Sequence, residues 1–329
     1  MTNLGVPFTD EGLQARVQAG IDEVEVQLAA AVHSPDAFVA EASAHLLNAG
    51  GKRFRPLLVM LAAEFGDQSH PDVPRSAVVV ELTHLATLYH DDVMDEASMR
   101  RGAPSANSRW DNSVAILVGD YLFAQASDLV SDLGPECVRI QARTFSRLVQ
   151  GQIRETLGPR EGDDHLAHYL AVVADKTGSL IATAARLGAK MAGASAEIEE
   201  TLTEFGERIG AAFQLSDDII DIASETGDSG KTPGTDLREG VPTLPTLIAL
   251  RSTDAEGDRL RSLLAKPLTD DDELAEAITL LRAHPAMDEA RAYVRAETDA
   301  AQALLAKLPD NAAREALQAL CTTVATRLG

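Results

Sequence analysis

The chain has 329 residues, of which 29 are Lys or Arg and 51 are Asp or Glu, so its formal net charge is −22 at pH 7. Because nucleic-acid binding requires cations that neutralise phosphates, this acidic chain without a Lys/Arg-rich segment is not expected to bind nucleic acid. Two cysteines are too few for a disulfide framework or a cysteine-based zinc site, which favours a cytoplasmic location. Residues 1–20 lack a signal-peptide pattern, and apolar runs such as 57–63 are far shorter than the roughly 20 residues of a membrane span.

Apolar residues recur at every third or fourth position along nearly the whole chain, as at Leu202, Phe205 and Ile209. Alternating β-branched segments are almost absent, and the nearest, 78–80, continues into a helical pattern. The sequence therefore predicts helices. Glycine and proline divide them at 50–51, 70–74, 102–104, 134–135, 158–162, 193, 227–245 and 267–272.

The longest irregular stretch covers residues 224–245 and contains several glycines together with Lys231, Asp236 and Arg238. Loops of this length inside a helical domain are more often functional than not, so we expect a lid here. Since no shift in composition marks a linker, we predict an all-α fold with a single domain over residues 1–329.

The pattern Asp-Asp-x-x-Asp occurs twice, at residues 91–95 and 217–221, each time within an apolar helical pattern. Residues four apart share a helix face, so the first and last carboxylates of each motif point the same way. Like charges at this spacing weaken a helix by a few tenths of a kcal/mol, which predicts a compensating cation. Carboxylate oxygens without cysteine select Mg²⁺ or Mn²⁺ over zinc.

Because Mg²⁺ usually shares its ligand shell between one or two carboxylates and substrate phosphates, two acidic helices predict a site that binds a diphosphate. The alternative is a solvated acidic surface on an acidic protein. This alternative is disfavoured because the Asp-Asp-x-x-Asp motif occurs twice, each time in an apolar helical pattern. The Asp-x-Asp-x-Asp-Gly spacing of an EF-hand is missing.

Cationic residues gather near these motifs. Residues 50–56 place Lys52, Arg53 and Arg55 on a Gly-Gly turn at a helix start, where free N–H groups and the helix dipole favour an anion. A surface turn without a ligand is the alternative, although cations in a first turn oppose the dipole. Further candidates for the anion site are His84, Arg100, Arg101, Lys176 and Lys231.

Taken together, these motifs resemble the trans-isoprenyl diphosphate synthases of the polyprenyl synthetase family, from residue 50 to about residue 245. The resemblance rests on Gly-Gly-Lys-Arg-Phe-Arg-Pro (50–56), His-Asp-Asp-Val-Met-Asp (90–95), Met-Arg-Arg-Gly-Ala-Pro (99–104), Gly-Asp-Tyr-Leu (119–122), Lys-Thr (176–177), Phe-Gln-Leu-Ser-Asp-Asp (213–218) and residues 230–237. It implies the isoprenoid synthase fold, a single-domain bundle of antiparallel helices around a central cavity, and usually a homodimer.

The resemblance also implies a reaction, in which the allylic C–O bond breaks and isopentenyl diphosphate attacks the resulting cation. The departing diphosphate is thought to accept the proton in this family. The implied ligands of up to three Mg²⁺ ions, which Mn²⁺ can replace, are Asp91, Asp92 and Asp95 on one wall and Asp217, Asp218 and Asp221 on the other. Lys52, Arg55, His84 and Arg101 would hold isopentenyl diphosphate, and Arg100, Lys176, Thr177, Gln214 and Lys231 would hold the allylic diphosphate. The central catalytic residues would be Asp91, Asp95, Asp217, Lys176 and Arg100.

Two residues depart from the family pattern. Gln150 stands where many members have Glu, and Val241 stands where many have Lys. Neither change affects the aspartates, so we still expect activity.

By the same resemblance, the small residues Ala86 and Thr87, five and four positions before the first motif, imply an open tunnel and an all-trans product of about C30 to C50. In this family a large aromatic there stops growth, whereas a barrier formed by Phe123, Phe145 or Leu148 would give a farnesyl or geranylgeranyl product instead.

A terpene cyclase is disfavoured by the residue 50–56 motif and the 4% aromatic content. A non-catalytic subunit of a heteromeric synthase, or a helical scaffold, is disfavoured by the two intact motifs. We expect at most a transient membrane contact for product release.

Overall fold

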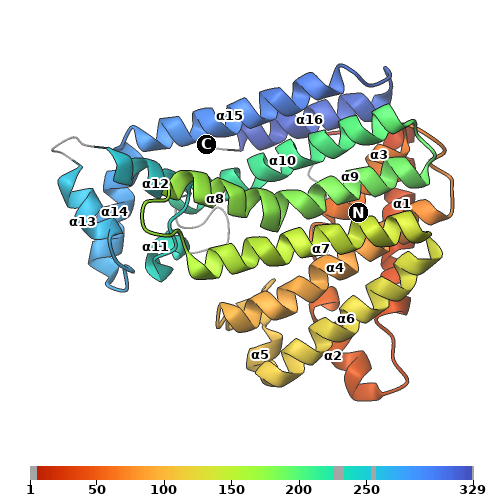
Figure 1. Cartoon of the computed structure of the whole chain (residues 1–329), viewed down its shortest axis with the longest axis horizontal. Coiled ribbons are helices and arrows are strands. Elements are labelled where there is room, and N and C mark those ends of the chain that lie inside the picture. The colour runs from red at the N-terminus through yellow and green to blue at the C-terminus, as the bar shows by residue number, and fades with distance from the viewer. Residues whose placement is uncertain (1–5, 225–232, 253–256, 328–329) are drawn as a thin grey trace. The chain divides into compact units, whose positions relative to one another are not determined.

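The computed structural model describes residues 6–224, 233–252 and 257–327, and its regular structure is nearly all helical (Figure 1). In chain order the helices are α1 (Glu11–Ala31), α2 (Ala37–Asn48), α3 (Phe54–Ala63), α4 (Asp72–Met94), α5 (Ala106–Arg109), α6 (Asn112–Asp132), α7 (Pro135–Leu157), α8 (His165–Val173), the π-helix η1 (Ala174–Gly178), α9 (Ser179–Met191), α10 (Ala196–Ala223), α11 (Thr235–Glu239), α12 (Leu244–Arg251), α13 (Asp258–Leu264), α14 (Asp271–Ala283), α15 (Ala286–Leu305) and α16 (Ala312–Thr326). The prediction of an all-α fold is confirmed.

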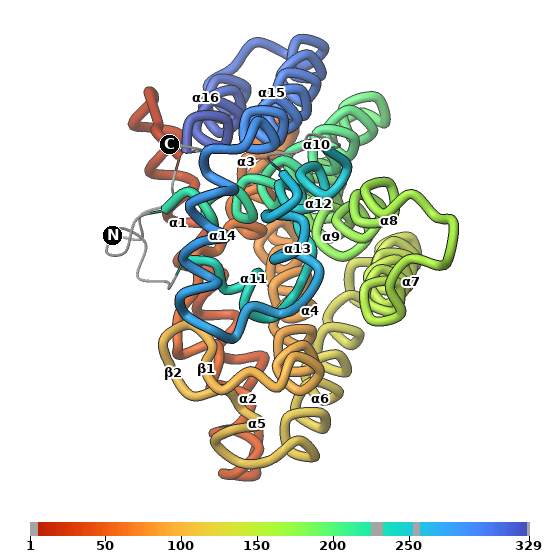
Figure 2. The backbone as a smooth tube through the Cα atoms, turned by 90° about the vertical axis from the view of Figure 1, so that its left-hand side faces the viewer, coloured from red at the N-terminus to blue at the C-terminus, as the bar shows by residue number. Residues whose placement is uncertain are grey.

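The strands β1 (Met99–Arg100) and β2 (Ala103–Pro104) form a short antiparallel hairpin after α4 (Figure 2). Its two-residue turn consists of Arg101 and Gly102, which have positive φ angles of 54° and 77°, as a type I′ turn requires. The predicted break at 102–104 is thus a tight hairpin.

Aspartate side chains cap the N-termini of several helices, which accounts for part of the acidic composition. Asp10, for example, accepts a hydrogen bond from the backbone N–H of Leu13 at 2.6 Å, and Asp36 accepts one from Phe38 at 2.9 Å. The break that Asp36 caps, between α1 and α2, was not predicted, although Ser34-Pro35 directly before the cap is a turn signal. The same type of cap is supplied by Asp111, Asp164 and Asp270.

Contacts along the chain divide it into two compact units. Unit 1 comprises Met1–Ser146, Leu180–Gly206 and Leu305–Ala319, and unit 2 comprises Arg147–Ser179, Glu207–Leu304 and Leu320–Gly329. Each unit is described by itself below, and the single domain over residues 1–329 stays a prediction.

Helix α4 is central to unit 1, because α1, α3, α5 and α6 all pack against it. The side chain of Tyr89 on α4 is completely buried; its hydroxyl donates to the carbonyl of Ala42 at 2.6 Å and accepts from the N–H of Leu46 at 3.2 Å. Burial raises the pKa of Tyr89 to about 12. These bonds fix to α2 the end of α4 that carries the first aspartate motif.

Unit 2 contains a smaller apolar core beneath α11, α13 and α14. Gly240 ends α11 with a φ of 75°, and a Cβ there would lie 2.8 Å from Cγ of Pro267, so the chain reverses tightly against this segment. The described part of residues 224–245 is therefore partly helical and packed. The core consists of Leu237, Leu263, Leu268, Leu274 and Ala277.

Candidate active site

The hairpin after α4 brings Arg101 to the predicted Gly-Gly turn. The Arg101 guanidinium donates to the carbonyl of Leu46 at 3.0 Å and to that of Gly50. Gly51 leaves the necessary space, since a Cβ there would lie 3.0 Å from Cζ of Arg101 and 2.6 Å from Nη1 of Arg53. Cations that are about fifty residues apart in the sequence therefore lie together in unit 1.

Four arginines act electrostatically on His84, and we call them the arginine cluster. Burial, followed by the charges of Arg55 and Arg101, holds the pKa of His84 well below its usual range, so the imidazole is neutral at pH 7. A neutral histidine beside several guanidiniums can donate to an anion without adding to their mutual repulsion. The cluster consists of Arg53, Arg55, Arg100 and Arg101.

The members of the cluster differ in how their charge is balanced. Arg53 is buried and pairs with Glu25 and, at 3.2 Å, with Glu81, so its charge is already neutralised. Arg55 has a buried Nε without a hydrogen-bond partner, and burial lowers the pKa of this arginine to about 10. The predicted Lys52 is exposed on the same turn. Arg55 thus has an unsatisfied donor in a buried, positively charged environment, as an anion site requires.

The three aspartates of the first motif do not share one environment. Helix α4 ends at Met94, and the N–H of Asp95 still donates to the carbonyl of Asp91 at 2.8 Å, so these two residues lie on one face as predicted. Asp91 is half-buried and Asp95 is exposed. Asp92 is fully buried and pairs with Nε of Arg100 at 2.6 Å. Burial raises the pKa of Asp92, although Arg100 opposes this effect.

In unit 2, Asp217 of the second motif pairs with Arg327, close to the C-terminal end of the described chain. The Arg327 guanidinium also lies 4.8 Å from the centre of the Phe213 ring, one helical turn before Asp217. Phe213 and Asp217 therefore hold the same cation from one face of α10. The sequence offered no signal for Arg327.

Asp218 is buried on another side of α10. It accepts from Nε2 of Gln214 at 3.1 Å and from the hydroxyl of Tyr169 on α8. Burial, and then the charge of Asp236, holds the pKa of Asp218 well above its usual range. Among the described residues, protein groups therefore surround the carboxylate of Asp218.

Asp221, the last residue of the second motif, connects α10 to the start of α11. Its two carboxylate oxygens accept from the backbone N–H groups of Thr235 and Asp236, both at 3.3 Å, and its carbonyl accepts from Gly234 at 2.9 Å. Asp221 thus anchors the segment that follows residues 225–232. The predicted Lys231 lies outside the described residues.

Lys176 and Thr177 lie in η1, a π-helical turn between α8 and α9 that the sequence did not predict. Such turns inside helices are frequent at functional sites. The hydroxyl of Thr177 donates to Oε1 of Gln214 at 3.3 Å, and Lys176 pairs with Glu155 on α7. The structure therefore brings the predicted Thr177, Gln214 and Asp218 into one hydrogen-bonded chain.

The chemistry of the aspartates fits a hard divalent cation. Asp91 and Asp95 offer only carboxylate oxygens on one face, as does Asp217 on α10. Among the described residues, no three His, Cys, Asp or Glu side chains approach one another closely enough to enclose a metal. Such carboxylates suit a hard divalent cation that completes its shell with phosphates and water.

The predicted chain-length residues are both buried on α4. Ala86 has no exposed surface, and the hydroxyl of Thr87 donates to the carbonyl of His84 at 2.8 Å. In the same unit, the rings of Phe123 and Phe145 have centres 4.3 Å apart. The residues that could limit chain growth therefore form two groups, the small residues Ala86 and Thr87 on α4 and the aromatic pair Phe123 and Phe145.

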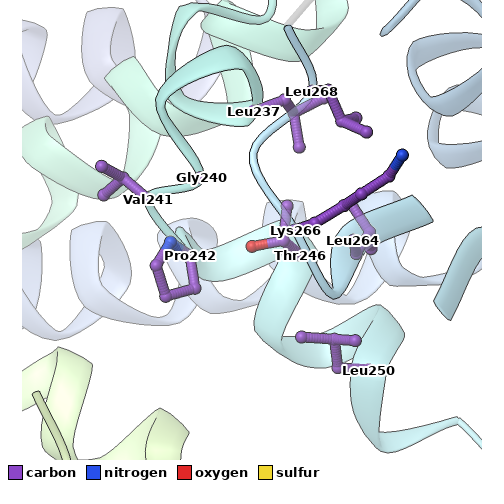
Figure 3. Close-up of a pocket in the computed structure, with 9 residues that line it drawn as sticks. All are labelled: Leu237, Gly240, Val241, Pro242, Thr246, Leu250, Leu264, Lys266 and Leu268. Atoms are coloured by element: carbon purple, nitrogen blue, oxygen red, sulfur yellow. The ribbon is translucent and has the colours of Figure 1, made fainter. Parts of the chain in front are cut away.

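Two cavities are lined by residues outside these groups. One, of about 20 Å³, lies between α11, α12 and the end of α13 and has Val241 and Lys266 in its lining, with space for about one water (Figure 3). The other, of about 290 Å³, is lined in unit 1 by residues of α1 and α3, including Arg16, Gly20 and Met60. Neither contains a predicted site residue.

Comparisons with known proteins show the family of this chain. The family model described as polyprenyl synthetase matches residues 36–281. The chain belongs to the polyprenyl synthetase family. Nonaprenyl diphosphate synthase of Mycobacterium tuberculosis is 52% identical over 328 residues, which is 99% of this chain and 97% of that protein. Dimethylallyltranstransferase of the same organism is 44% identical, with 96% of each chain covered.

Among solved structures, geranylgeranyl pyrophosphate synthase from Corynebacterium glutamicum, complexed with calcium and isoprenyl diphosphate, superimposes with a TM-score of 0.90. It is 49% identical to this chain, and the alignment covers 98% of this chain and all of the other. The isoprenoid synthase fold and the assignment as a trans-prenyltransferase are thus confirmed.

Proposed function

We propose that this polyprenyl synthetase condenses isopentenyl diphosphate with an allylic diphosphate in a Mg²⁺-dependent reaction. The observation that carries the proposal is the arginine cluster at the Gly-Gly turn: Arg53 and Arg101 lie 3.2 and 4.0 Å from the carboxylate of Glu81 on α4, the helix whose last turn carries Asp91. A cluster with an unsatisfied Arg55 donor favours a highly charged anion such as a diphosphate.

Two groups of residues serve the two substrates in this proposal. Lys52, Arg55, His84 and Arg101 hold the diphosphate of isopentenyl diphosphate. Arg100, Lys176, Thr177, Gln214 and Lys231 serve the allylic diphosphate. Asp92 keeps the guanidinium of Arg100 in place through the 2.6 Å ion pair. Since charge develops on the leaving diphosphate as the C–O bond breaks, cations held in place by protein contacts lower the barrier.

Asp91, Asp95 and Asp217 would hold Mg²⁺, with Asp92, Asp218 and Asp221 as their neighbours in the motifs; up to three ions are expected, and Mn²⁺ would substitute. When bound, Mg²⁺ neutralises the diphosphate and favours its departure. The calcium and isoprenyl diphosphate in the C. glutamicum structure support this role for a divalent cation. Asp218, which is buried against Tyr169, would orient Gln214 rather than contact the ion.

For the product we propose a medium or long all-trans chain of about C30 to C50. The small side chains of Ala86 and Thr87 support this length, as does the 52% identity to a nonaprenyl diphosphate synthase. A farnesyl or geranylgeranyl product is the second candidate, favoured by the contact between Phe123 and Phe145 and by the 49% identical geranylgeranyl pyrophosphate synthase.

We also propose a cytoplasmic homodimer, supported by apolar side chains that remain exposed on α6 and α7. Leu117 on α6 is 66% exposed and Leu157 on α7 is 78% exposed, and Ile116 and Ile153 are also exposed. Of the described helices, α6 is the one long and apolar enough to cross a membrane, with a mean hydropathy of 1.3, but it packs against α4. A second copy of the chain would cover such surfaces, so Leu117→Glu should shift the mass measured by light scattering from dimer to monomer.

The decisive experiment incubates the protein with Mg²⁺, labelled isopentenyl diphosphate and allylic diphosphates of C5, C10, C15 or C20, and then separates the dephosphorylated products. A ladder that reaches C30 or beyond supports the long-chain proposal. Termination at C15 or C20 supports the second candidate. Absence of incorporated label would refute the proposed activity and favour a non-catalytic subunit of a heteromeric synthase.

A further inference from the structure

The π-helical turn η1 is held by an arginine that the motifs do not include. Arg147 on α7 donates from Nε to Oδ1 of Asp175 at 3.0 Å, and its two terminal nitrogens donate to the carboxylate of Glu207 on α10. One of these nitrogens is also 3.4 Å from the carbonyl of Ala174, the first residue of η1. A single guanidinium thus connects three helical elements of unit 2 at the turn that carries Lys176 and Thr177.

The turn has further supports on the same side. Arg154, two turns after Arg147 on α7, pairs with the other carboxylate oxygen of Asp175, and the hydroxyl of Ser179 donates to the carbonyl of Asp175 at 2.6 Å. Asp175 therefore receives two guanidiniums from one helix. Because a planar guanidinium presents donors in a fixed fork, these contacts define the orientation of the turn and not only its charge.

Close packing explains why the turn can be held so directly. A Cβ on Gly151 of α7 would lie 2.8 Å from the backbone nitrogen of Lys176 and 3.0 Å from Cβ of Asp175. Only glycine allows α7 to approach the backbone of η1 to this distance. The network, defined as Arg147, Asp175 and Glu207 with Arg154, thus surrounds a contact between backbones.

On the opposite side of η1, the hydroxyl of Thr177 donates to Gln214, and the amide of Gln214 donates to Asp218. If η1 relaxed to an ordinary α-helical turn, the residues after it would rotate about the helix axis by roughly 100°, because one residue fewer would fit in the turn. The side chains of Lys176 and Thr177 would then leave their present directions. The ion pairs of Asp175 on one side of η1 therefore determine where the side chains of Lys176 and Thr177 point.

We propose that Arg147 is a positioning residue for the allylic diphosphate, acting through Asp175 and the π-helical turn on Lys176 and Thr177. The inference rests on the proposed function of these two residues. Arg147 itself contacts Asp175, Glu207 and the Ala174 carbonyl, so its role is to maintain the π-helical geometry. Its influence should be restricted to the allylic substrate, since the residues proposed for isopentenyl diphosphate belong to other elements.

The test compares Arg147→Gln and Arg147→Lys with the wild type in steady-state kinetics, in which each substrate is varied separately. For Arg147→Gln we expect the KM for farnesyl diphosphate to rise about 10-fold or more, since small misplacements of binding groups have effects of this size. The KM for isopentenyl diphosphate should differ from the wild-type value by less than about twofold. Arg147→Lys should raise the KM for farnesyl diphosphate less than Arg147→Gln does, because lysine keeps the positive charge but lacks the planar set of donors of arginine.

A matched control is available in Arg259→Gln. Arg259 also donates twice to one carboxylate, that of Glu276 at 2.9 and 2.5 Å, and it is similarly exposed, but it contacts no part of η1. Thermal unfolding of the two glutamine variants should be alike. Gly151→Ala is the independent variant, since its methyl group would displace η1 from the other direction and should produce the same selective loss.

Equal kinetics for Arg147→Gln and Arg259→Gln would overturn the proposal. So would an equal rise in both KM values, since this would indicate a general structural role. Calorimetric binding of farnesyl diphosphate, measured without isopentenyl diphosphate, separates the two hypotheses: a wild type that binds but does not turn over refutes the proposed function, while a selective loss of binding in Arg147→Gln still supports the positioning role.

Discussion

Arg327 and Asp217 form an ion pair in unit 2, and the guanidinium of Arg327 lies at the same time over the ring of Phe213. A residue beside the C-terminus is thus bound to the carboxylate for which a metal-binding role is proposed. Because Mg²⁺ and a guanidinium would use the same carboxylate oxygens, the two cations should compete for Asp217.

This competition predicts that Arg327→Gln binds metal more tightly in the absence of substrate. Asp217 is 36% exposed, so the ion pair should have the modest strength of a surface pair, and the expected gain is about two- to fivefold in affinity. Mn²⁺ binding followed by electron paramagnetic resonance measures this directly. Arg291→Gln is the control, because it removes a comparably exposed arginine that pairs with Asp288 at 3.0 Å on α15. Equal affinity in both variants would contradict the prediction.

The aspartates that are proposed to bind metal should be required for turnover and not for folding. Asp91→Asn or Asp217→Asn removes a charged ligand but preserves side-chain volume, so kcat should fall about 10³-fold or more, since a metal contributes several kcal/mol of charge stabilisation. Circular dichroism should show unchanged helicity, and chelation of Mg²⁺ should stop the wild-type reaction. Asp22→Asn, on the exposed surface of α1, serves as the control. Loss of helicity in the first two variants would mean that these aspartates are structural.

The sequence pattern predicted the helical elements and which motif residues share a helix face, because both depend on local spacing. Asp91 and Asp95 share a face for this reason, and the glycines at 50–51 and 102 lie at real turns. The α1–α2 break and η1 were missed. The break that Asp36 caps follows Ser34-Pro35, a single turn signal without glycine. A π-helical turn arises when tertiary contacts hold one extra residue, which periodicity along a single helix does not detect.

Partners distant in sequence were also beyond prediction. The contact of Tyr169 with Asp218 joins residues on different helices, and that of Arg327 with Asp217 joins residues 110 positions apart. Periodicity assigns a residue to a face of its own helix, but it does not identify the group that packs against that face. This explains why six aspartates were predicted as equivalent ligands, although Asp92 and Asp218 are buried against protein groups.

Ala86 provides a test of product length. Ala86→Phe should shorten the longest product, because an aromatic ring at this buried position of α4 would block the proposed tunnel. The equally buried Ala77, on the same helix, is the matched control: Ala77→Phe should cost similar stability, about 1–3 kcal/mol from overpacking, without shortening the product. Product chromatography and thermal unfolding give the two readouts. If Ala86→Phe leaves the length unchanged while Phe145→Ala increases it, the aromatic pair sets the limit instead.

His84 should make the stability of the protein depend on pH in a specific direction. Its pKa in the folded state lies well below the value of about 6.5 that it has in an unfolded chain. Between these two values the unfolded state binds more protons, so the free energy of unfolding should decrease as the pH falls below about 6.5. The contribution of one such group has a slope of at most about 1.4 kcal/mol per pH unit.

His84→Gln removes this proton and should flatten the decrease, which urea unfolding measured between about pH 5 and pH 8 can detect. Asp92 and Asp218, whose pKa values are raised, act with the opposite sign, because their folded forms bind the extra proton. They are present in both proteins, so the difference between wild type and variant isolates His84. Parallel pH profiles would contradict the prediction, because they would mean that the imidazole binds its proton equally well in the folded and the unfolded state.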